Sequence, residues 1–300
     1  MPDIDVLCVG HACYDLTFAV PHHPAADEKA VAQALVGSGG GPAANAAVTV
    51  ARLGLRAAFA GNLGNDPWGE RHFQELCNEG VSTGLVVRGS APTPLSAILV
   101  KPDGKRTVIN YRGRTEFLPE DSLDLSTVHP RVILFDGHEP HLSLPLVRTA
   151  RQAGIPTVLD AGSVHAGTRS LADKVDYLAC SEKFAREFTG LADPERAALE
   201  LHAIAPKVVV TLGKVGLVWV DAGRPQRLAA FEVRTVDSTG AGDAFHGALA
   251  ACLAEGREWE AALRFASAAA ALTCTRLGAR PGIPTRTEVD EFLTNHPEES

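Results

Sequence analysis

The order of apolar runs along the chain predicts an α/β fold with a mostly parallel central sheet. Short β-prone runs, such as Val6–Val9, Val132–Phe135 and Val208–Leu212, alternate with helix-like stretches such as Ala43–Leu53 and Leu144–Ala153. Parallel strands are buried on both faces and are joined by crossover helices, so this alternation is the sequence pattern that they leave.

Two segments, approximately 12–37 and 94–117, interrupt this alternation. They hold alternating β-prone stretches with turn signals, including Pro102-Asp-Gly104 between two such stretches. We expect them to form a small β-sheet lid that projects over the edge of the main sheet. No repeat or linker divides the 300 residues, so the sequence predicts one domain over 1–300.

Composition excludes several classes of protein. The net charge is −8 and the Lys and Arg residues are scattered, which argues against a nucleic-acid or anionic-membrane partner. The six cysteines are widely spaced without C-x-x-C, as expected for reduced thiols in a cytoplasmic protein. No basic leader precedes the first β-prone run, and no apolar run approaches about 18 residues, so neither a signal peptide nor a membrane span is expected.

A run of small residues, Gly240-Ala-Gly242, stands directly before an apolar segment with helical spacing. Such a turn leaves the first N–H groups of a helix unpaired, and small side chains let a phosphate approach them. Asp243 follows, and a carboxylate beside a phosphate is explained if it accepts the proton of an attacking hydroxyl. The pattern favours phosphoryl transfer to an alcohol; its structural alternative is an ordinary glycine-rich turn with Asp in the first helical turn.

A second glycine-rich element, Gly39-Gly-Gly41, leads into a predicted helix that begins near Asn45, whose amide could hold a sugar hydroxyl. Gly39-x-Gly41-x-x-Ala44 also matches a dinucleotide-binding fingerprint. That fingerprint belongs directly after the first strand, whereas here it lies about thirty residues later. No P-loop and no protein-kinase motif occurs, so ATP would bind in another architecture. The stretch His138-Glu-Pro-His141 lacks the H-E-x-x-H spacing of a metal pair and is expected to be a surface turn.

The two glycine-rich elements, in this order and at this separation, resemble the signatures of the ribokinase-like (PfkB) family of sugar kinases. Gly39–Asn45 is similar to the N-terminal signature G-G-x-x-x-N. Asp237–Phe245 is similar to the C-terminal signature D-T-x-G-A-G-D-x-F, with Ser238 in place of Thr. Thr211–Gly216 and Gly278–Pro284 agree with two further family segments. The resemblance covers essentially the whole chain and implies a three-layer ribokinase-like core with a small β-sheet lid.

The resemblance implies a role for each residue that matches a family motif. It makes Asp243 the catalytic base and makes Gly240, Ala241 and Gly242 the anion hole for the transferring phosphate. It places substrate hydroxyls against Asp15, Gly40, Gly41 and Asn45. It lines the nucleotide with Ser181, Thr211, Gly213, Gly216, Ala271 and Cys274. Asp237, with the loop 280–284, matches the place where some relatives bind a monovalent cation such as K⁺.

One motif departs from the family pattern. Where members often carry N-x-x-E, associated with Mg²⁺ and phosphate, the chain reads Ser181-Glu-Lys-Phe184. We expect Glu182 to substitute in part as a Mg²⁺ contact. Ketohexokinase-like and sulfofructose-kinase-like members deviate at the same place, so the departure points to a subfamily.

Overall, the chain most resembles the 6-deoxy-6-sulfofructose kinases, in segments that include Ile109-Asn-Tyr111 and Phe245–Ala250. That resemblance implies substrate contacts for Lys29, Asn110 and His138, the last standing where such enzymes place an Arg. The guanidinium groups of Arg112 and Arg114 could bind an acidic substituent instead, or form a solvated hairpin tip. His11, like His138, either meets a hydroxyl or is structural.

The sequence therefore predicts an ATP- and Mg²⁺-dependent sugar kinase that acts on a primary hydroxyl of a ketose-like or acidic sugar, with 6-deoxy-6-sulfofructose as one candidate. A ribose or nucleoside kinase of the same family is the enzymatic alternative. An NAD-dependent oxidoreductase and a non-catalytic sugar-binding regulator are the alternatives of other classes. Exposed strand edges of the lid predict a homodimer that forms through it.

Overall fold

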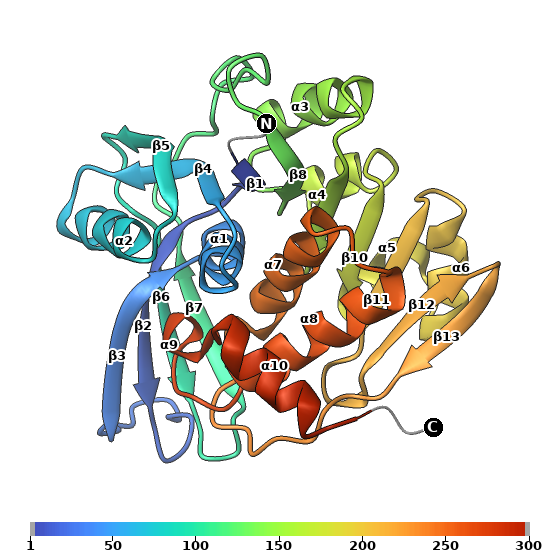
Figure 1. The fold of residues 1–300 in the computed structure, drawn as a ribbon. Coiled ribbons are helices and arrows are strands. Elements are labelled where there is room, and N and C mark those ends of the chain that lie inside the picture. Colours follow the sequence, from blue (N-terminus) through green and yellow to red (C-terminus); the bar gives the residue numbers. More distant parts are fainter. Residues whose placement is uncertain (1–3, 298–300) are drawn as a thin grey trace.

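The computed structural model describes residues 4–297, which fold into a nine-stranded sheet flanked by helices and a separate four-stranded sheet (Figure 1). The strands are β1 Ile4–Val9, β2 Cys13–Ala19, β3 Ala34–Gly40, β4 Ala57–Gly64, β5 Ser82–Gly89, β6 Leu95–Val100, β7 Arg106–Tyr111, β8 Pro130–Phe135, β9 Thr157–Ala161, β10 Tyr177–Ser181, β11 Lys207–Thr211, β12 Leu217–Asp221 and β13 Arg224–Leu228. The helices are α1 Pro42–Arg52, α2 Pro67–Asn78, α3 Pro140–Gln152, α4 Ala166–Leu171, α5 Glu182–Thr189, α6 Pro194–His202, the 3₁₀ turn η1 Gly213–Val215, α7 Ala241–Ala254, α8 Trp259–Thr273, α9 Ala279–Gly282 and α10 Arg286–Thr294.

The large sheet is mostly parallel, as predicted. Its strand order is β13-β12-β11-β10-β9-β8-β1-β4-β5, and the pairs from β11 to β5 are all parallel. Only the pairs β11-β12 and β12-β13, at one edge, are antiparallel. The carboxyl ends of the parallel strands therefore meet along one side of the sheet, where ligands bind in folds of this kind.

Strand β1 shows why the parallel strands appear as continuous apolar runs in the sequence. Val6 and Cys8 pack into one core, together with residues of α1, α7 and α8. Leu7 and Val9 pack into a second core on the opposite face, together with residues of α3, α5 and α6. All four side chains are fully buried, so both faces of the strand need apolar residues. The arrangement confirms the predicted three layers of helix, sheet and helix.

Helix α7 lies at the centre of the first helical layer. Its residues from Ala244 to Cys252 are all buried, and it packs against both α1 and α8. Gly247 permits the close approach to α1, because a Cβ at this position would lie 2.6 Å from the carbonyl oxygen of Ala46. This packing holds the first turn of α7 in a fixed place beside the carboxyl ends of the strands.

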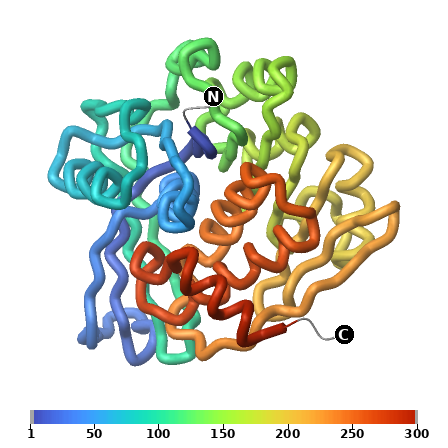
Figure 2. Tube along the Cα trace, viewed as in Figure 1, coloured from blue at the N-terminus to red at the C-terminus, as the bar shows by residue number. Residues whose placement is uncertain are grey.

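The four-stranded sheet is the predicted lid, with the order β3-β2-β6-β7, and it extends from the lower left of the molecule (Figure 1, Figure 2). Strands β2 and β6 pair in parallel, while the outer strands pair antiparallel. The predicted hairpin turn is present between β6 and β7, where Gly104 has a φ of +73°. Strand β3 runs to Gly40, beyond the predicted limit at 37, so the lid continues directly into the glycine-rich element.

The prediction of one domain over 1–300 includes both chain ends, which lie outside the described residues. Within residues 4–297 the chain crosses between the two sheets four times: it enters the lid from β1 into β2 and from β5 into β6, and it returns from β3 through α1 into β4 and from β7 into β8. Over the same residues, no helix has both the length and the apolar character that crossing a membrane requires.

Candidate active site

The first turn of α7 leaves the backbone N–H of Gly242 accessible, and that of Ala241 makes one long hydrogen bond, of 3.4 Å, to the carbonyl oxygen of Ser238. Gly240 is the N-cap residue with a φ of +78°, and no side chain within residues 4–297 caps the helix. A Cβ on Gly240 would lie 2.6 Å from the Cβ of Ala279, so only glycine fits between the turn and α9. A Cβ on Gly242 would meet no described atom within 4 Å, so the space before this residue is open. An open, uncapped N-terminus of a 14-residue helix is suited to an anion.

Asp243 is half-buried at this helix end, and Asn45 of α1 holds its side chain. The Nδ2 of Asn45 donates to Oδ2 of Asp243 at 2.8 Å. The Oδ1 of Asn45 accepts from Nε of Arg280 at 3.3 Å, which fixes the orientation of the amide. Burial raises the pKa of Asp243, and the hydrogen bond from Asn45 offsets part of that rise. The carboxylate is thus held in one place with increased basicity, as a proton acceptor requires.

The glycine-rich element joins the lid to α1, since Gly39 and Gly40 end strand β3 and Gly41 is the N-cap of α1. A Cβ on Gly40 would lie 2.1 Å from Oδ2 of Asp15, and one on Gly41 would lie 2.5 Å from the carbonyl oxygen of His11. Gly41 also has a φ of +96°, which favours glycine. Asp15 is buried on β2, and burial raises its pKa, while Cys13 donates its S–H to Oδ1 at 3.2 Å. The structure therefore brings Asp15, Gly40 and Gly41 together, although their substrate roles stay predictions.

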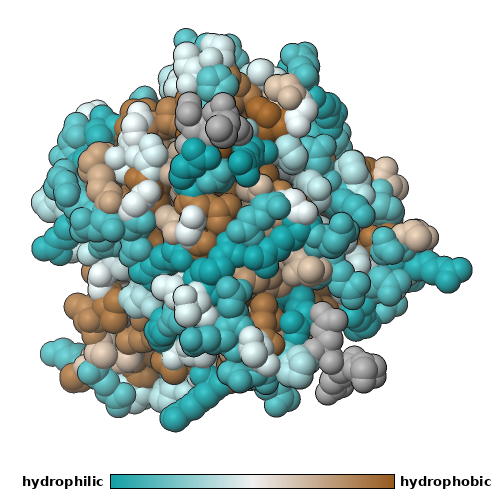
Figure 3. All heavy atoms as spheres, viewed as in Figure 1, coloured by the Kyte–Doolittle hydropathy of each residue, from teal (hydrophilic) through white to brown (hydrophobic). Residues whose placement is uncertain are grey.

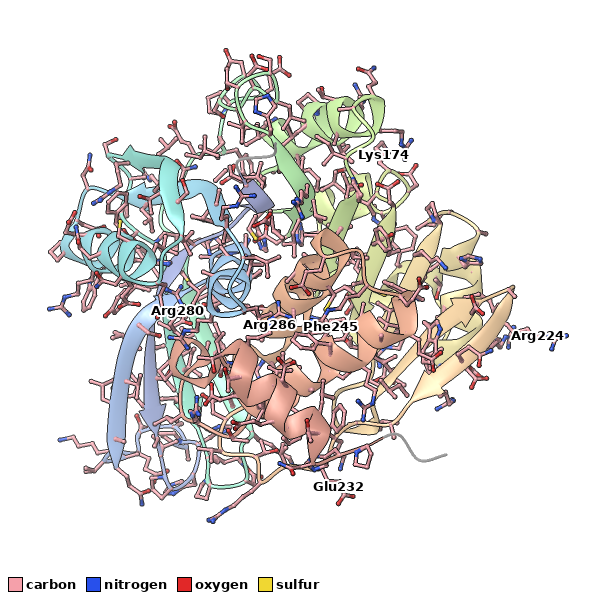
Figure 4. All side chains as sticks on the ribbon, in the orientation of Figure 1. Lys174, Arg224, Glu232, Phe245, Arg280 and Arg286 are labelled. Atoms are coloured by element: carbon pink, nitrogen blue, oxygen red, sulfur yellow. The ribbon has the colours of Figure 1, made fainter. Side chains whose placement is uncertain are left out.

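Arg280 joins three parts of the chain behind the site. It is 4% exposed and lies beside α1, as Figure 4 shows. Its Nη2 donates to Nε2 of His72 at 3.1 Å, and its Nη1 lies 3.7 Å from Oε2 of Glu75. That carboxylate also accepts from the backbone N–H of Gly39 at 2.6 Å. Because Arg280 also binds Asn45, this buried cation fixes the glycine-rich element relative to the amide that holds Asp243.

Polar residues form a row across the lid sheet. In the strand register Asp15 lies beside Ser38 on one side and Ser96 on the other, and Ser96 lies beside Asn110. Neighbouring residues in register point to the same face of a sheet. Asn110, which we predicted as a substrate contact, therefore shares a face of the lid with Asp15.

Arg106, the first residue of β7, connects the lid with the C-terminal signature. Its Nη1 donates to Oγ of Ser238 at 2.5 Å, and its charge acts to lower the pKa of Asp243. Ser238 stands two residues before the N-cap of α7. The lid therefore places a guanidinium group next to the anion-binding helix end, an arrangement that the sequence reasoning did not anticipate.

Three imidazoles gather at the carboxyl ends of β1, β8 and β9. The ring of His138 lies 5.2 Å from that of His11 and 4.7 Å from that of His165, measured between centroids. Burial lowers the pKa of His11 and of His165 to about 4, so both rings are neutral acceptors or donors near neutral pH. The charge of Arg112 acts on all three histidines, which places this guanidinium group near them.

The carboxylate of Asp136 binds the backbone of two of these histidines. Its Oδ2 accepts the backbone N–H of His11 at 2.8 Å and that of Ala43 at 3.2 Å, and its Oδ1 accepts that of His138 at 2.9 Å. Burial alone would raise the pKa of Asp136, but the charge of His138 and these hydrogen bonds lower it to about 2. Burial opposes the protonation of His138, whereas the carboxylate of Asp136 raises its pKa. One buried carboxylate thus ties β1, α1 and β8 together at the site.

The prediction of a surface turn at His138–His141 was wrong. Pro140 begins helix α3, because a proline at the first helical position lacks only an N–H that would be unpaired there. Glu139 is buried before it, with Oε2 accepting from the backbone N–H of Leu118 at 2.6 Å. Burial raises the pKa of Glu139 to about 7. The segment belongs to the interior edge of the site rather than to the surface.

The predicted nucleotide residues lie at the ends of β10 and β11 and on α8. Thr211 pairs in register with Ser181, and its Oγ1 lies 3.3 Å from the carbonyl oxygen of Cys180. The hydroxyl of Ser181 caps α5 by accepting from the N–H of Phe184 at 3.0 Å, and donates to the carbonyl of Gly162. It therefore has a structural role, and its nucleotide role stays a prediction.

The remaining predicted nucleotide contacts surround these strand ends. Gly213 and Gly216 have φ values of +58° and +113°, as the tight turn η1 requires. Ala271 and Cys274 lie at the end of α8, where the carbonyl of Cys274 accepts the N–H of Asp237 at 3.2 Å. The structure thus places the end of α8 beside the C-terminal signature.

Neither predicted metal residue belongs to a preformed metal cage. Glu182 is exposed in the first turn of α5, and residues 4–297 contain no group of three or more His, Cys, Asp or Glu side chains arranged for a metal. Asp237 is fully buried and accepts three hydrogen bonds, two from Thr239 and one from the N–H of Gly278 at 2.9 Å. Its carboxylate fastens the loop before α9, and its cation role is untested.

Two further residues that we considered as substrate contacts lie on the surface. Lys29 and Arg114 are exposed in loops that flank the lid strands.

The sequence reasoning missed five residues near the site: Arg106, Asp136, Asp160, His165 and His246. For Asp136 and Asp160 a signal existed, since each closes an apolar β-prone run, and acidic residues at the carboxyl ends of parallel strands commonly reach ligands. The others carried no local signal.

Comparison with known proteins agrees with this geometry. The family model described as pfkB family carbohydrate kinase matches residues 3–286. This chain belongs to the pfkB family of carbohydrate kinases. It is therefore an ATP-dependent carbohydrate kinase, and the dinucleotide-dependent and regulatory alternatives are set aside.

Individual relatives cover nearly the whole chain. Ribokinase of Bacillus subtilis is 30% identical over 295 residues, covering 97% of this chain and 99% of its own. Fructokinase-1 of Oryza sativa is 32% identical over 293 residues, covering 88% of this chain and 91% of its own. Among solved structures, ribokinase from Thermotoga maritima superposes with a TM-score of 0.84 at 29% identity, covering 97% and 100% of the two chains. Ribokinase from Arabidopsis thaliana, complexed with ribose and ATP, also gives 0.84, at 27% identity over 98% and 99%.

Proposed function

We propose that this kinase transfers the γ-phosphate of ATP to a primary hydroxyl of a small sugar. One observation carries the proposal: Asp243, held by Asn45, stands at the open N-terminus of α7. A proton acceptor beside an anion site is the arrangement that phosphoryl transfer to an alcohol needs.

In the proposed mechanism, Asp243 accepts the proton of the attacking hydroxyl while that oxygen bonds to the γ-phosphorus and ADP leaves. The N–H groups of Ala241 and Gly242 bind the oxygens of the transferring group, and the helix end stabilises the charge on them. Asn45 keeps the carboxylate aligned with the hydroxyl. No covalent intermediate on the enzyme is required.

Mg²⁺ would arrive with ATP and shield the phosphate charges. This metal is commonly bound by phosphates, water and one or two carboxylates rather than by a protein cage. Glu182, exposed at the start of α5, offers one such carboxylate, so the residues present fit MgATP. Asp237 is saturated with hydrogen bonds in its present position, so the proposal includes no K⁺ step.

The sugar is proposed to lie between the polar face of the lid and the histidine cluster. Asp15 and Asn110 belong to the lid and Arg112 directly follows its strand β7, while His11 and His138 follow β1 and β8 of the large sheet. Relatives named ribokinase and fructokinase favour a pentose or a ketohexose. The guanidinium group of Arg112 could pair with the acidic group of a sugar such as 6-deoxy-6-sulfofructose, so an acidic sugar is a further candidate. A nucleoside is the remaining alternative.

We also propose that two copies associate through the lid. Large apolar side chains on its strands are exposed, including Leu35 at 58%, Ile109 at 63% and Tyr111 at 56%. Figure 3 shows hydrophobic residues gathered at the lower left, over the lid. The outer strands β3 and β7 each have an unpaired edge within the described sheet. An Ile109→Glu variant should convert a dimer into a monomer by light scattering; a wild-type monomer at micromolar concentration would contradict the proposal.

The test of the function is ADP release by the purified protein with MgATP across a panel of acceptors: ribose, fructose, 6-deoxy-6-sulfofructose, fructose phosphates, 2-keto-3-deoxygluconate and adenosine. We expect one sugar to accelerate ADP release far above the rate without acceptor, with the phosphate on a primary oxygen by ³¹P NMR. Reaction of adenosine alone would select the nucleoside alternative. No acceleration by any acceptor, together with phosphate release to water, would contradict the proposal.

A further inference from the structure

A buried histidine lies directly behind the proposed anion site. His246 follows Asp243 by three residues on α7 and is 3% exposed. Its Nδ1 lies 2.6 Å from the carbonyl oxygen of Gly242 and 3.2 Å from Oδ2 of Asp160. Its Nε2 lies 3.1 Å from the carbonyl oxygen of Ala179 on β10. Both ring nitrogens therefore face oxygen acceptors.

The hydrogen-bond partners determine which form of this imidazole fits. A backbone carbonyl can only accept, and a neutral imidazole has one N–H donor and one lone pair. In either neutral tautomer, one nitrogen lone pair would face a carbonyl oxygen at hydrogen-bond distance inside the protein, which is unfavourable. The imidazolium form donates to both carbonyls, and the adjacent carboxylate of Asp160 supplies the opposite charge that a buried cation needs.

The position of this charge connects it with the reaction. The carbonyl that Nδ1 contacts belongs to Gly242, whose own N–H faces the open space before the helix. Asp243 is the next residue. Burial raises the pKa of Asp243, and the charge of His246 acts in the opposite direction. Asp160 is 7% exposed, and burial raises its pKa to about 6 against the opposing effect of His246.

We propose that His246 is a positioning residue of this kinase, held as an imidazolium by Gly242, Ala179 and Asp160, which keeps Asp243 ionised and adds positive charge behind the anion site. It touches neither phosphate nor sugar and acts only through the first turn of α7. The effect on transfer rests on the proposed function; the protonation of His246 does not.

Other groups also act on Asp243 and limit the size of the effect. The charged or titratable side chains that face it or act on its charge are Asp15 from β2, Arg106 from β7, Asp136 after β8, Asp160 from β9 and His246 from α7, with the amide of Asn45 from α1. Three of the charges are negative and two are positive. Removing the charge of His246 should therefore shift the titration of Asp243 rather than abolish activity.

The first experiment measures the protonation of His246 directly. In the uniformly ¹⁵N-labelled full-length protein at pH 7, we expect both ring nitrogens to carry protons, because each faces an oxygen acceptor. The His246→Asn variant identifies the signals by their loss, and sequential backbone assignment identifies them if that variant does not fold. A neutral ring with one unprotonated nitrogen at pH 7 would overturn the proposal, whether or not the protein proves to be a sugar kinase.

The second experiment measures the effect on Asp243. His246→Asn keeps a donor near the position of Nδ1, and His246→Gln keeps one near that of Nε2, but neither carries a charge. In both variants we expect the acid limb of kcat/KM to move up by about one pH unit, with KM for the sugar changed less than about threefold. Cys252→Ala, which changes the packing of the same helix, should leave the limb in place.

An effect confined to one variant would indicate a hydrogen bond rather than a charge, and an unchanged limb in both would overturn the proposal. If no acceptor sugar is found, the same shift is measured in the ¹³C titration of the Asp243 carboxylate. A missing shift there would refute the inference about His246, whereas a missing acceptor alone would refute only the proposed reaction.

Discussion

The carboxyl edge of the large sheet and the lid contribute to the site in contrasting ways. Outside the lid, Asp136 at this edge and Arg280 on α9 are almost fully buried, and each joins several segments through hydrogen bonds or close polar contacts. In the lid, strand β7 is exposed along its whole length, and Arg106 reaches the body through one contact with Ser238. The proposed base, Asp243, must be placed accurately for proton transfer, and it stands in the buried, well-connected region. Arg106, which is proposed to meet the phosphate, stands on the exposed lid strand.

This contrast predicts different consequences of mutation. Changes at the first turn of α7 should lower kcat without unfolding the protein, because the space there is open for a ligand. Changes in the lid should weaken binding of sugar or phosphate and leave stability nearly unchanged. The predictions below test this division, beginning with the largest effect.

Gly242→Val should lower kcat on the order of 10²–10³-fold, because the side chain would occupy the open space in which a phosphate meets the helix N–H groups. Valine is tolerated in a helix about as well as glycine, so the melting temperature should change little. Ala254→Val, at the other end of the same helix, is the control and should keep wild-type turnover. Equal activity of the two variants in the ADP-release assay would exclude phosphate binding at this turn.

Gly40→Ala should lower kcat/KM for the sugar by about 10- to 100-fold. The new Cβ would lie 2.1 Å from Oδ2 of Asp15, so that the buried carboxylate or the glycine-rich element must move. Gly37→Ala on the same strand is the control, since its Cβ would come no closer than 3.3 Å to any described atom, the nearest being the hydroxyl oxygen of Tyr14. Steady-state kinetics with varied sugar measure the effect. A larger loss in Gly37→Ala than in Gly40→Ala would contradict the assigned role of Asp15.

Arg106→Ala should lower kcat/KM for ATP by about tenfold, because the lid would no longer bring a positive charge to the end of α7. Lys105→Ala, which removes the adjacent exposed charge, should have less than a twofold effect. Both variants should unfold at the wild-type temperature. If Arg106→Ala instead destabilised the fold and left kinetics intact, the contact with Ser238 would be only structural.

The pH dependence of stability offers the smallest effect. The pKa of Asp136 is lowered to about 2 in the folded protein from the ordinary value of 3.8, since the charge of His138 and hydrogen bonds outweigh its burial. Its stabilising contribution of about 2 kcal/mol is present above pH 4 and is lost as the pH falls towards 2. Asp136→Asn should therefore make the free energy of unfolding, measured in urea, fall less between pH 6 and pH 3. The role would be contradicted if the free energy of unfolding of Asp136→Asn fell over this pH range as much as that of wild type and of the exposed control Asp121→Asn.

The fold and the helix end that carries Asp243 could be predicted because their signals are local in the sequence. Fully buried strands such as Val208–Leu212 are continuous apolar runs, and Gly240 to Asp243 are consecutive residues whose order implies a helix end with a base. Strands β4, β5 and β13 were missed for physical reasons. Strand β4 is rich in Ala and Gly, and β5 and β13 are edge strands with many polar or glycine positions, so none has the usual β-prone composition.

The rest of the site depends on contacts between distant segments. Arg106 and Ser238 are 132 residues apart, and His246 meets a carbonyl 67 residues before it. No spacing rule connects such pairs, because only the packing of α7 against the sheet and of the lid over the body brings them together. Pro140 was misinterpreted for a different reason, since a proline ends some helices but also begins many others.

The most direct test of the account is ADP release by Asp243→Asn at saturating MgATP and sugar. The account predicts that kcat falls on the order of 10²–10⁴-fold, about 3–5 kcal/mol in activation free energy, while calorimetry shows ATP bound and the melting temperature of wild type retained. Asn45 could still donate to the new amide oxygen, so the change removes the basic group with little disturbance of its neighbours. Turnover at the wild-type rate in this variant would contradict the assignment of Asp243 as the base, and with it the proposed mechanism.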